Sequence, residues 1–176
     1  MSGILIRKAD IGDLDAVEKI YDKIHDDEES GKQTTCWVRG VYPTRQTAED
    51  AAEKGELFVL EDSGAVLGAA IINNTQVDVY SGGSWEYAAK DDEVCVLHTL
   101  VISPDASGKG YGKAFVAFYE NYAKENGCPE LRMDTNEKNK AARGLYNKLG
   151  YREVGIVPTV FNGIPNIHLV LLEKHL

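Results

Sequence analysis

Residues 94–113 read VCVLHTLVISPDASGKGYGK, and we interpret this stretch as the one around which the fold is built. Its first part, 94–102, is apolar or β-branched apart from one histidine, and the turn-forming segment 103–105 closes it, as expected of a buried strand. Glycines then alternate at positions 108, 110 and 112, directly before a segment with helical periodicity. Because the first N–H groups of a helix have no partner inside it, such an entry predicts an anion site, most often for phosphate.

Two well-known phosphate loops fit this stretch poorly. A P-loop carries Ser or Thr after its Gly-Lys pair, whereas Ala114 follows Lys113 here, and Ser107 stands where the first glycine of that loop belongs. A dinucleotide-binding GxGxxG motif needs a third glycine, but Lys113 or Phe115 occupies that position, depending on which glycine pair starts the motif. A nucleotide-binding protein of either kind is therefore the less favoured alternative.

The segment SGKGYG, residues 107–112, resembles the acyl-CoA-binding signature of the GNAT superfamily of N-acetyltransferases, Q/R-x-x-G-x-G/A. It departs from that signature at Ser107, where the family usually has Gln or Arg. A second block resembles the family's "N…A…lYeklGF" segment, and it consists of Asn139, Ala142, Leu145, Tyr146, Leu149, Gly150 and Tyr151. The resemblance extends over essentially the whole chain.

The resemblance implies a single-domain GNAT-like fold over residues 1–176, of the α/β (α+β) class, in which about four helices flank a twisted mixed central β-sheet. The residue patterns predict the same kind of architecture by themselves. Strands are expected at residues 4–7, 56–61, 65–73, 94–102, 131–135, 151–157 and 167–172, with a five-residue turn at 161–165 between the last two. Helices are expected to follow the N-cap residue Asp10, to run through 44–54 from a Thr44 or Thr47 cap, and to cover 110–126 and 139–149.

Fewer structural predictions can be made for the loops. The acidic run 26–31 is interpreted as a solvated loop at the end of the first helix, with attraction of an amine substrate as the alternative. Trp37 and Tyr42 are predicted to act as lid residues or packing anchors. The resemblance implies that the loop between the first two helices covers the acceptor substrate, so the acceptor-selecting residues are expected near 36–42 and 76–87.

Composition limits the classes of partner. The chain has 176 residues and a formal net charge of −9, which argues against nucleic acid because phosphate binding needs a basic surface. It has no apolar run long enough for a membrane span, and residues 1–20 lack a signal-peptide pattern. The three cysteines, Cys36, Cys95 and Cys128, have no metal-like spacing and fit free thiols in a reducing cytoplasm.

Acetyl transfer to an amine needs a base for the amine, hydrogen-bond donors for the oxyanion and an acid for the departing thiolate. The resemblance implies that Tyr146 is the acid, with a packing role as the alternative. His98 is a candidate base because its ordinary pKa suits proton transfer near neutrality, although a lone strand histidine is also a common core residue. Glu93 and Glu86 are competing carboxylate bases, or plain surface charges.

For the acetyl-CoA co-substrate, the resemblance implies that the backbone of Leu100, Val101 and Ile102 pairs with the pantetheine amides. It also implies contacts of Asn139 and Tyr146 with the pantetheine arm. The pyrophosphate is expected at the glycine turn, formed by Ser107, Gly108, Lys109, Gly110, Tyr111, Gly112 and Lys113.

The predicted function is a cytoplasmic, acetyl-CoA-dependent N-acetyltransferase acting directly on a primary amine, either a small molecule or a peptide. A homodimer is a further possibility that the resemblance raises, whereas nucleic-acid and membrane partners and a bound metal are not expected. The alternative is a module that holds acyl-CoA without transferring the acyl group. Turnover of acetyl-CoA with a panel of amines separates the two.

Overall fold

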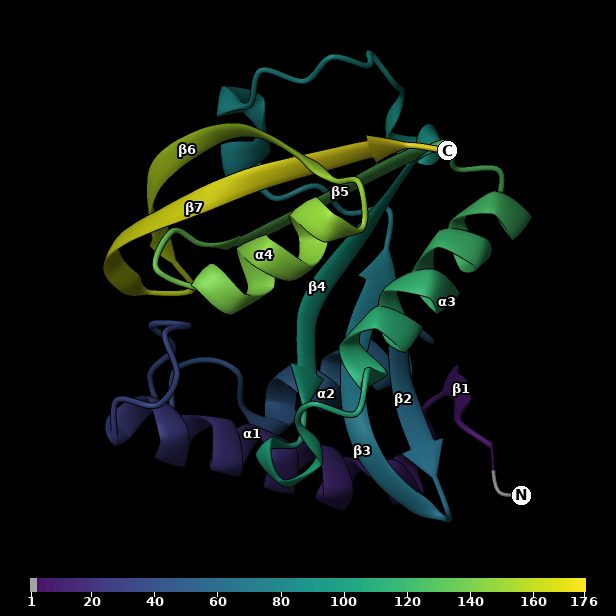
Figure 1. Ribbon diagram of the computed structural model, residues 1–176, viewed down its shortest axis with the longest axis vertical. Helices are drawn as coiled ribbons and strands as arrows, with labels where there is room; N and C mark the ends of the chain where they lie inside the picture. Colours follow the sequence, from purple (N-terminus) through teal and green to yellow (C-terminus); the bar gives the residue numbers. More distant parts are fainter. Residues whose placement is uncertain (1–2) are drawn as a thin grey trace.

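The computed structural model describes residues 3–176, and its centre is a twisted seven-stranded sheet in the order β1-β2-β3-β4-β5-β7-β6 (Figure 1). The strands are β1 (Leu5–Lys8), β2 (Leu57–Asp62), β3 (Ala65–Asn73), β4 (Val94–Ile102), β5 (Glu130–Asn136), β6 (Arg152–Phe161) and β7 (Ile164–His175). The α-helices are α1 (Leu14–Glu29), α2 (Arg45–Glu53), α3 (Tyr111–Glu125) and α4 (Lys140–Lys148). Short 3-10 turns lie at Ile11–Asp13, Asp78–Gly82, Asp91–Glu93 and Pro104–Ala106.

The predicted mixed α/β fold is confirmed. Strands β4 and β5 run parallel, whereas the other neighbouring pairs of the described sheet run antiparallel. Helix α2 begins at Thr44, which forms a capping box with Thr47, and Asp10 caps the turn that leads into α1, both as expected. Within residues 3–176, no helix combines the length and the hydrophobicity that crossing a bilayer requires.

Three apolar cores lie on the two faces of the sheet, and one of them joins Val94 and Val96 of β4 to Tyr80 and the closing strands. Helices α3 and α4 pack on one face, where α3 places the aromatic residues Tyr111, Phe115 and Tyr119 in the core. Helices α1 and α2 pack on the other face through residues such as Val17 and Ala48. Because side chains alternate along a strand, successive residues of β4 and β5 point to opposite cores.

The acidic run was wrongly predicted as a loop, because α1 continues through Glu29. Its carboxylates have partners in the segment that follows: Arg39 pairs with Asp26 and Glu29 at 2.5 and 2.9 Å. The Glu28 carboxylate accepts the backbone N–H groups of Thr35 and Cys36 over 2.9 and 3.0 Å. The run therefore anchors the loop between α1 and α2.

The closing strands are longer than predicted. Strand β6 reaches Phe161 and β7 begins at Ile164, so the expected five-residue turn is a hairpin whose tip is Asn162 and Gly163. Both tip residues have positive φ, 48° and 85°, as a tight two-residue hairpin turn requires. This hairpin brings Phe161 next to the α1–α2 loop, where it packs on Tyr42.

Candidate functional site

The sheet opens between its two parallel strands. Residues Val94–Leu97 of β4 pair with Glu130–Met133 of β5, and past that point β4 stays with β3 while β5 stays with β7 (Figure 1). The edge of β4 over 98–102 therefore faces no other described strand on that side. An open strand edge presents unpaired N–H and C=O groups and can accept an extended ligand as an extra strand.

The buried Tyr119 of α3 bridges the two parallel strands within their paired segment. Its hydroxyl donates to the Cys95 carbonyl over 2.6 Å and lies 3.3 Å from the Arg132 carbonyl, so one group contacts both parallel strands. Beyond it, Thr99 has a φ of 49° at an irregularity in the β3–β4 register, and its hydroxyl is hydrogen-bonded to Tyr42. This bulge turns β4 away from β5.

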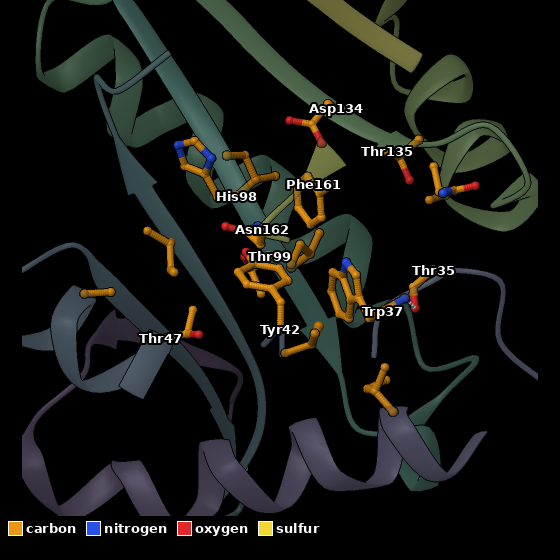
Figure 2. A pocket seen from close by; sticks show the side chains of 18 of the residues that line it. Thr35, Trp37, Tyr42, Thr47, His98, Thr99, Asp134, Thr135, Phe161 and Asn162 are labelled. Atoms are coloured by element: carbon orange, nitrogen blue, oxygen red, sulfur yellow. Dashed lines mark hydrogen bonds between the residues drawn. The ribbon is translucent and has the colours of Figure 1, made fainter. Parts of the chain in front are cut away.

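The opening continues into a cavity of about 890 Å³ (Figure 2). Its wall comes from segments far apart in the sequence: the α1–α2 loop, the end of β3, the open half of β4, the end of β5, α4 and the β6–β7 hairpin. Seven of the fifteen residues that the sequence analysis predicted for the site lie on this wall: His98, Leu100, Val101, Ile102, Ser107, Asn139 and Tyr146.

Tyr146 lies on α4 and is 7% exposed, with its residual exposure on the cavity wall. Its hydroxyl makes no hydrogen bond to any part of the chain between residues 3 and 176, and its ring packs edge-on against Tyr151. Burial, together with the nearby Asp134 carboxylate, raises the pKa of Tyr146 above its ordinary value. The phenol is therefore protonated at neutral pH and free to donate to a group placed in the cavity.

His98 is the first residue of β4 past the paired segment. Its Nε2 lies 2.8 Å from Asn73 Oδ1, which also accepts the Thr75 N–H group over 2.9 Å, while the Asn73 amide N–H donates to Glu56 Oε2. Because Asn73 Oδ1 is an acceptor, we assign the proton to His98 Nε2, which leaves Nδ1 with a lone pair. Burial lowers the pKa of His98 to about 4, so the imidazole is neutral at pH 7.

The other two predicted bases lie away from the cavity. Glu93 precedes β4 at the opposite end from the opening, and its carboxylate accepts the Lys90 N–H group over 2.9 Å. Glu86 is half exposed and pairs with Arg152 at 2.9 Å. The structure therefore does not bring these two carboxylates together with His98 and Tyr146.

The glycine turn lies at the surface, beside the mouth of the cavity at Ser107. Gly108 and Gly110 adopt φ values of 77° and 80°, and Gly110 is the residue that precedes α3. Among residues 3–176 no side chain caps this helix, so its first N–H groups are available to an anion. Lys109 and Lys113 are exposed next to these groups.

Two further predicted cofactor-binding residues are held by neighbouring elements. The Tyr111 hydroxyl donates to Asp62 on β2 over 2.6 Å, which fixes the first turn of α3 to the sheet. Asn139 is the N-cap of α4, and its side-chain oxygen accepts a hydrogen bond from the Ala142 N–H group over 3.1 Å. Asn139 also lines the cavity. Gly112 approaches α4 closely, because a Cβ there would lie 3.3 Å from Leu145.

Sequence reasoning missed Asp134, which lines the cavity at the end of β5. The only signal was its alternation with Leu131 and Met133, which shows that it faces the other side of the sheet from them. Phe161 was also missed, since it was assigned to a turn. Trp37 and Tyr42 were predicted as lid residues or anchors, and both lie on the cavity wall (Figure 2).

Comparison with known proteins gives a consistent result. A family model described as acetyltransferase (GNAT) family matches residues 17–151. Among curated proteins, the uncharacterized N-acetyltransferase YhfO of Bacillus subtilis is 35% identical over 60 residues, which make up 34% of this chain and 40% of that protein. The match therefore spans well under two thirds of this relative's length.

Two solved structures share the fold over nearly the whole chain. A GNAT-family acetyltransferase from Streptococcus agalactiae superposes with a TM-score of 0.84 at 22% identity, covering 99% of this chain and 96% of that one. A Salmonella typhimurium protein solved with its cofactor acetyl-CoA superposes with a TM-score of 0.72 at 18% identity, covering 99% and 94%.

Proposed function

The chain belongs to the acetyltransferase (GNAT) family, and on that premise we propose that it transfers an acetyl group from acetyl-CoA directly to a primary amine. Acetyl-CoA is the acetyl donor of the family, and a protein of the same fold was solved with it. The observation that carries the proposal is the opening between β4 and β5, which joins an unpaired strand edge to a cavity containing the free Tyr146 hydroxyl.

In this proposal the pantetheine arm enters the opening as an extra strand on β4. Its amides pair with the backbone of Leu100, Val101 and Ile102, and Asn139 contacts the arm from α4. The pyrophosphate binds the N-terminus of α3, where the unpaired N–H groups after Gly110 supply donors and the helix dipole supplies positive potential. Backbone groups make most of these contacts, so Ser107 in place of Gln or Arg removes little.

The chemistry follows from the groups around the opening. The amine nitrogen attacks the acetyl carbonyl, and a C–N bond forms before the C–S bond breaks. In this mechanism, backbone N–H groups of the Thr99–Leu100 bulge donate to the oxyanion of the tetrahedral intermediate, and the left-handed backbone at Thr99 supports that assignment. Tyr146 gives its proton to the departing thiolate, forming the CoA thiol, and is reprotonated by the proton that leaves the nitrogen.

The attacking nitrogen must be a free amine, so its ammonium proton has to pass to a base. We take His98 and Asp134 as the candidate bases on the cavity wall. The other two wall carboxylates, Asp50 and Glu56, accept the side-chain amide N–H groups of Gln46 and Asn73. Neither Glu93 nor Glu86 enters the mechanism that we propose, because both lie outside the cavity.

Calorimetric titration with acetyl-CoA tests the first half of the proposal, with ATP as the control ligand. Micromolar binding of acetyl-CoA without binding of ATP is the expected result, and release of free CoA thiol on addition of amines tests the second half. Absence of acetyl-CoA binding refutes the proposed function. Binding without thiol release for any amine favours a module that holds acyl-CoA without transferring it.

A further inference from the structure

The carboxylate of Asp134 lies at the point where the strands part, on the wall of the cavity (Figure 2). Its Oδ2 accepts the Tyr80 hydroxyl over 2.7 Å, whereas Oδ1 has no hydrogen-bond partner among residues 3–176. One oxygen is thus held by the protein and the other is left for a ligand. A carboxylate oxygen in such a position accepts hydrogen bonds from N–H donors.

No side chain in the described part of the chain neutralises this carboxylate, because it takes part in no ion pair there. The ionisable groups that face it are phenols from three different elements, Tyr42, Tyr80 and Tyr146, each with its pKa raised by burial. Burial also raises the pKa of Asp134 itself to about 6. A carboxylate buried without a counter-charge is unfavourable until a cation binds beside it.

Aromatic side chains form the adjoining wall. Tyr42 stands between Trp37 at 5.7 Å and Phe161 at 5.1 Å, both in edge-to-face geometry, so the α1–α2 loop and the β6–β7 hairpin meet here (Figure 2). Aromatic faces attract cations and pack well against hydrocarbon. The wall therefore suits a molecule with an ammonium group next to an apolar body.

The cavity is unsuited to an anionic group. Its wall carries three carboxylates, Asp50, Glu56 and Asp134, and among the described residues one ammonium, Lys54. Lys54 is exposed and follows α2, on a different element from the aromatic wall. A carboxylate on the acceptor would lose its hydration in the cavity and meet a negative wall.

We propose, on the basis of the acetyl transfer proposed above, that Asp134 binds the ammonium group of the acceptor and takes its proton. The acceptor class is then a primary alkyl- or arylalkylammonium with no carboxylate beside the amine. His98 is the weaker base, because its imidazole is hydrogen-bonded to Asn73 and burial lowers its pKa to about 4.

Groups on the cavity wall account for every proton that moves in the reaction. A primary ammonium loses two protons on its way to the acetamide: Asp134 takes the first, which frees the lone pair that forms the C–N bond. The second leaves the nitrogen after attack and replaces the proton that Tyr146 gave to the thiolate. Asp134 then releases its proton to solvent, so each turnover yields one amide, one CoA thiol and one proton.

The test compares phenethylamine with phenylalanine, which share a skeleton and differ by the carboxylate, in the wild type and in Asp134→Asn. We expect thiol release with phenethylamine at a kcat/KM at least 10²-fold above that with phenylalanine. Asp134→Asn should lower kcat/KM for phenethylamine by about 10²-fold or more and remove the rise in rate through pH about 6, with acetyl-CoA affinity unchanged.

Two further variants sharpen the result. Asp92→Asn changes an exposed carboxylate before β4 and should leave the rate unchanged. His98→Gln should cost less than Asp134→Asn. A larger loss in His98→Gln, or preference for phenylalanine, or an Asp134→Asn variant with wild-type rate overturns the inference while acetyl transfer stands. If the wild type does not bind acetyl-CoA at all, the proposed function fails and this inference falls with it.

Discussion

Replacing Asp134 by asparagine should make the folded chain more stable at neutral pH, although the same change is expected to abolish most activity. Burial raises the pKa of Asp134 from 3.8 to about 6, with the Tyr80 hydrogen bond opposing the shift. One pKa unit corresponds to about 1.36 kcal/mol, so a shift of roughly 2 units represents about 3 kcal/mol of unfavourable free energy when the carboxylate is ionised. Asparagine has nearly the same shape, carries no charge and can still accept the Tyr80 hydroxyl.

The sign of this effect fixes its pH dependence. The folded pKa lies above the unfolded one, so the folded state binds more protons between about pH 4 and pH 6 and loses stability as pH rises through that window. Above about pH 6 the loss of folding stability no longer changes with pH. The stability gain of Asp134→Asn should therefore grow from about 1 kcal/mol near pH 4.5 to about 3 kcal/mol near pH 7.5.

Urea denaturation monitored by the fluorescence of the two tryptophans measures this difference at each pH. Asp92→Asn is the matched control, because it removes the same charge from an exposed position and should give a difference near zero throughout. A variant that is less stable than the wild type near pH 7.5, or a gain that does not grow with pH, would refute the assignment of Asp134 as a buried, uncompensated carboxylate.

Three other substitutions test the remaining parts of the site. Tyr146→Phe should lower kcat by about 10²-fold with the acetyl-CoA dissociation constant unchanged, which steady-state kinetics and calorimetry measure together. Gly110→Ala should lower the free energy of unfolding by about 1 kcal/mol in urea denaturation and weaken acetyl-CoA binding, because φ at this residue is 80°. The control is Gly144→Ala within α4, which should instead stabilise the protein by about 0.5–1 kcal/mol. Tyr119→Phe should cost about 1–3 kcal/mol, since two buried carbonyls lose its hydroxyl, and wild-type stability would contradict its role at the parting strands.

Local sequence patterns were sufficient to predict most of the helices and strands. Strand β4 has the bounds that its apolar run predicted, and the turn before α3 has left-handed residues at two of its three glycines. These features depend on neighbours in the sequence, through sterics and periodicity. The loop prediction for 26–31 was wrong for the opposite reason, because its outcome depends on residues further along the chain. Helix α1 extends through this run while Arg39 pairs with its carboxylates and N–H groups of the following loop donate hydrogen bonds to them.

The two halves of the site differ in the same way. In the proposed function the donor half consists largely of backbone groups, at the open edge of β4 and the start of α3. A strand pattern and glycines are enough to indicate such groups in a sequence. The acceptor half is made of side chains, and Trp37, Asp134 and Phe161 come from three segments that meet only because β4 and β5 part. Nothing local marks a strand carboxylate as facing a cavity rather than solvent.

This division has a physical consequence for specificity. A site built from backbone groups keeps its ligand while side chains around it change, so we expect Ser107 at the glycine turn to cost little acetyl-CoA affinity. A site built from side chains on an interhelical loop and a hairpin tip changes its ligand with single substitutions. We therefore expect Asp134, a carboxylate of the cavity wall that has no ion-pair partner among residues 3–176, to define the acceptor more directly than the family does. Under the proposed function, the cost of this carboxylate in stability is offset when a cation occupies the cavity.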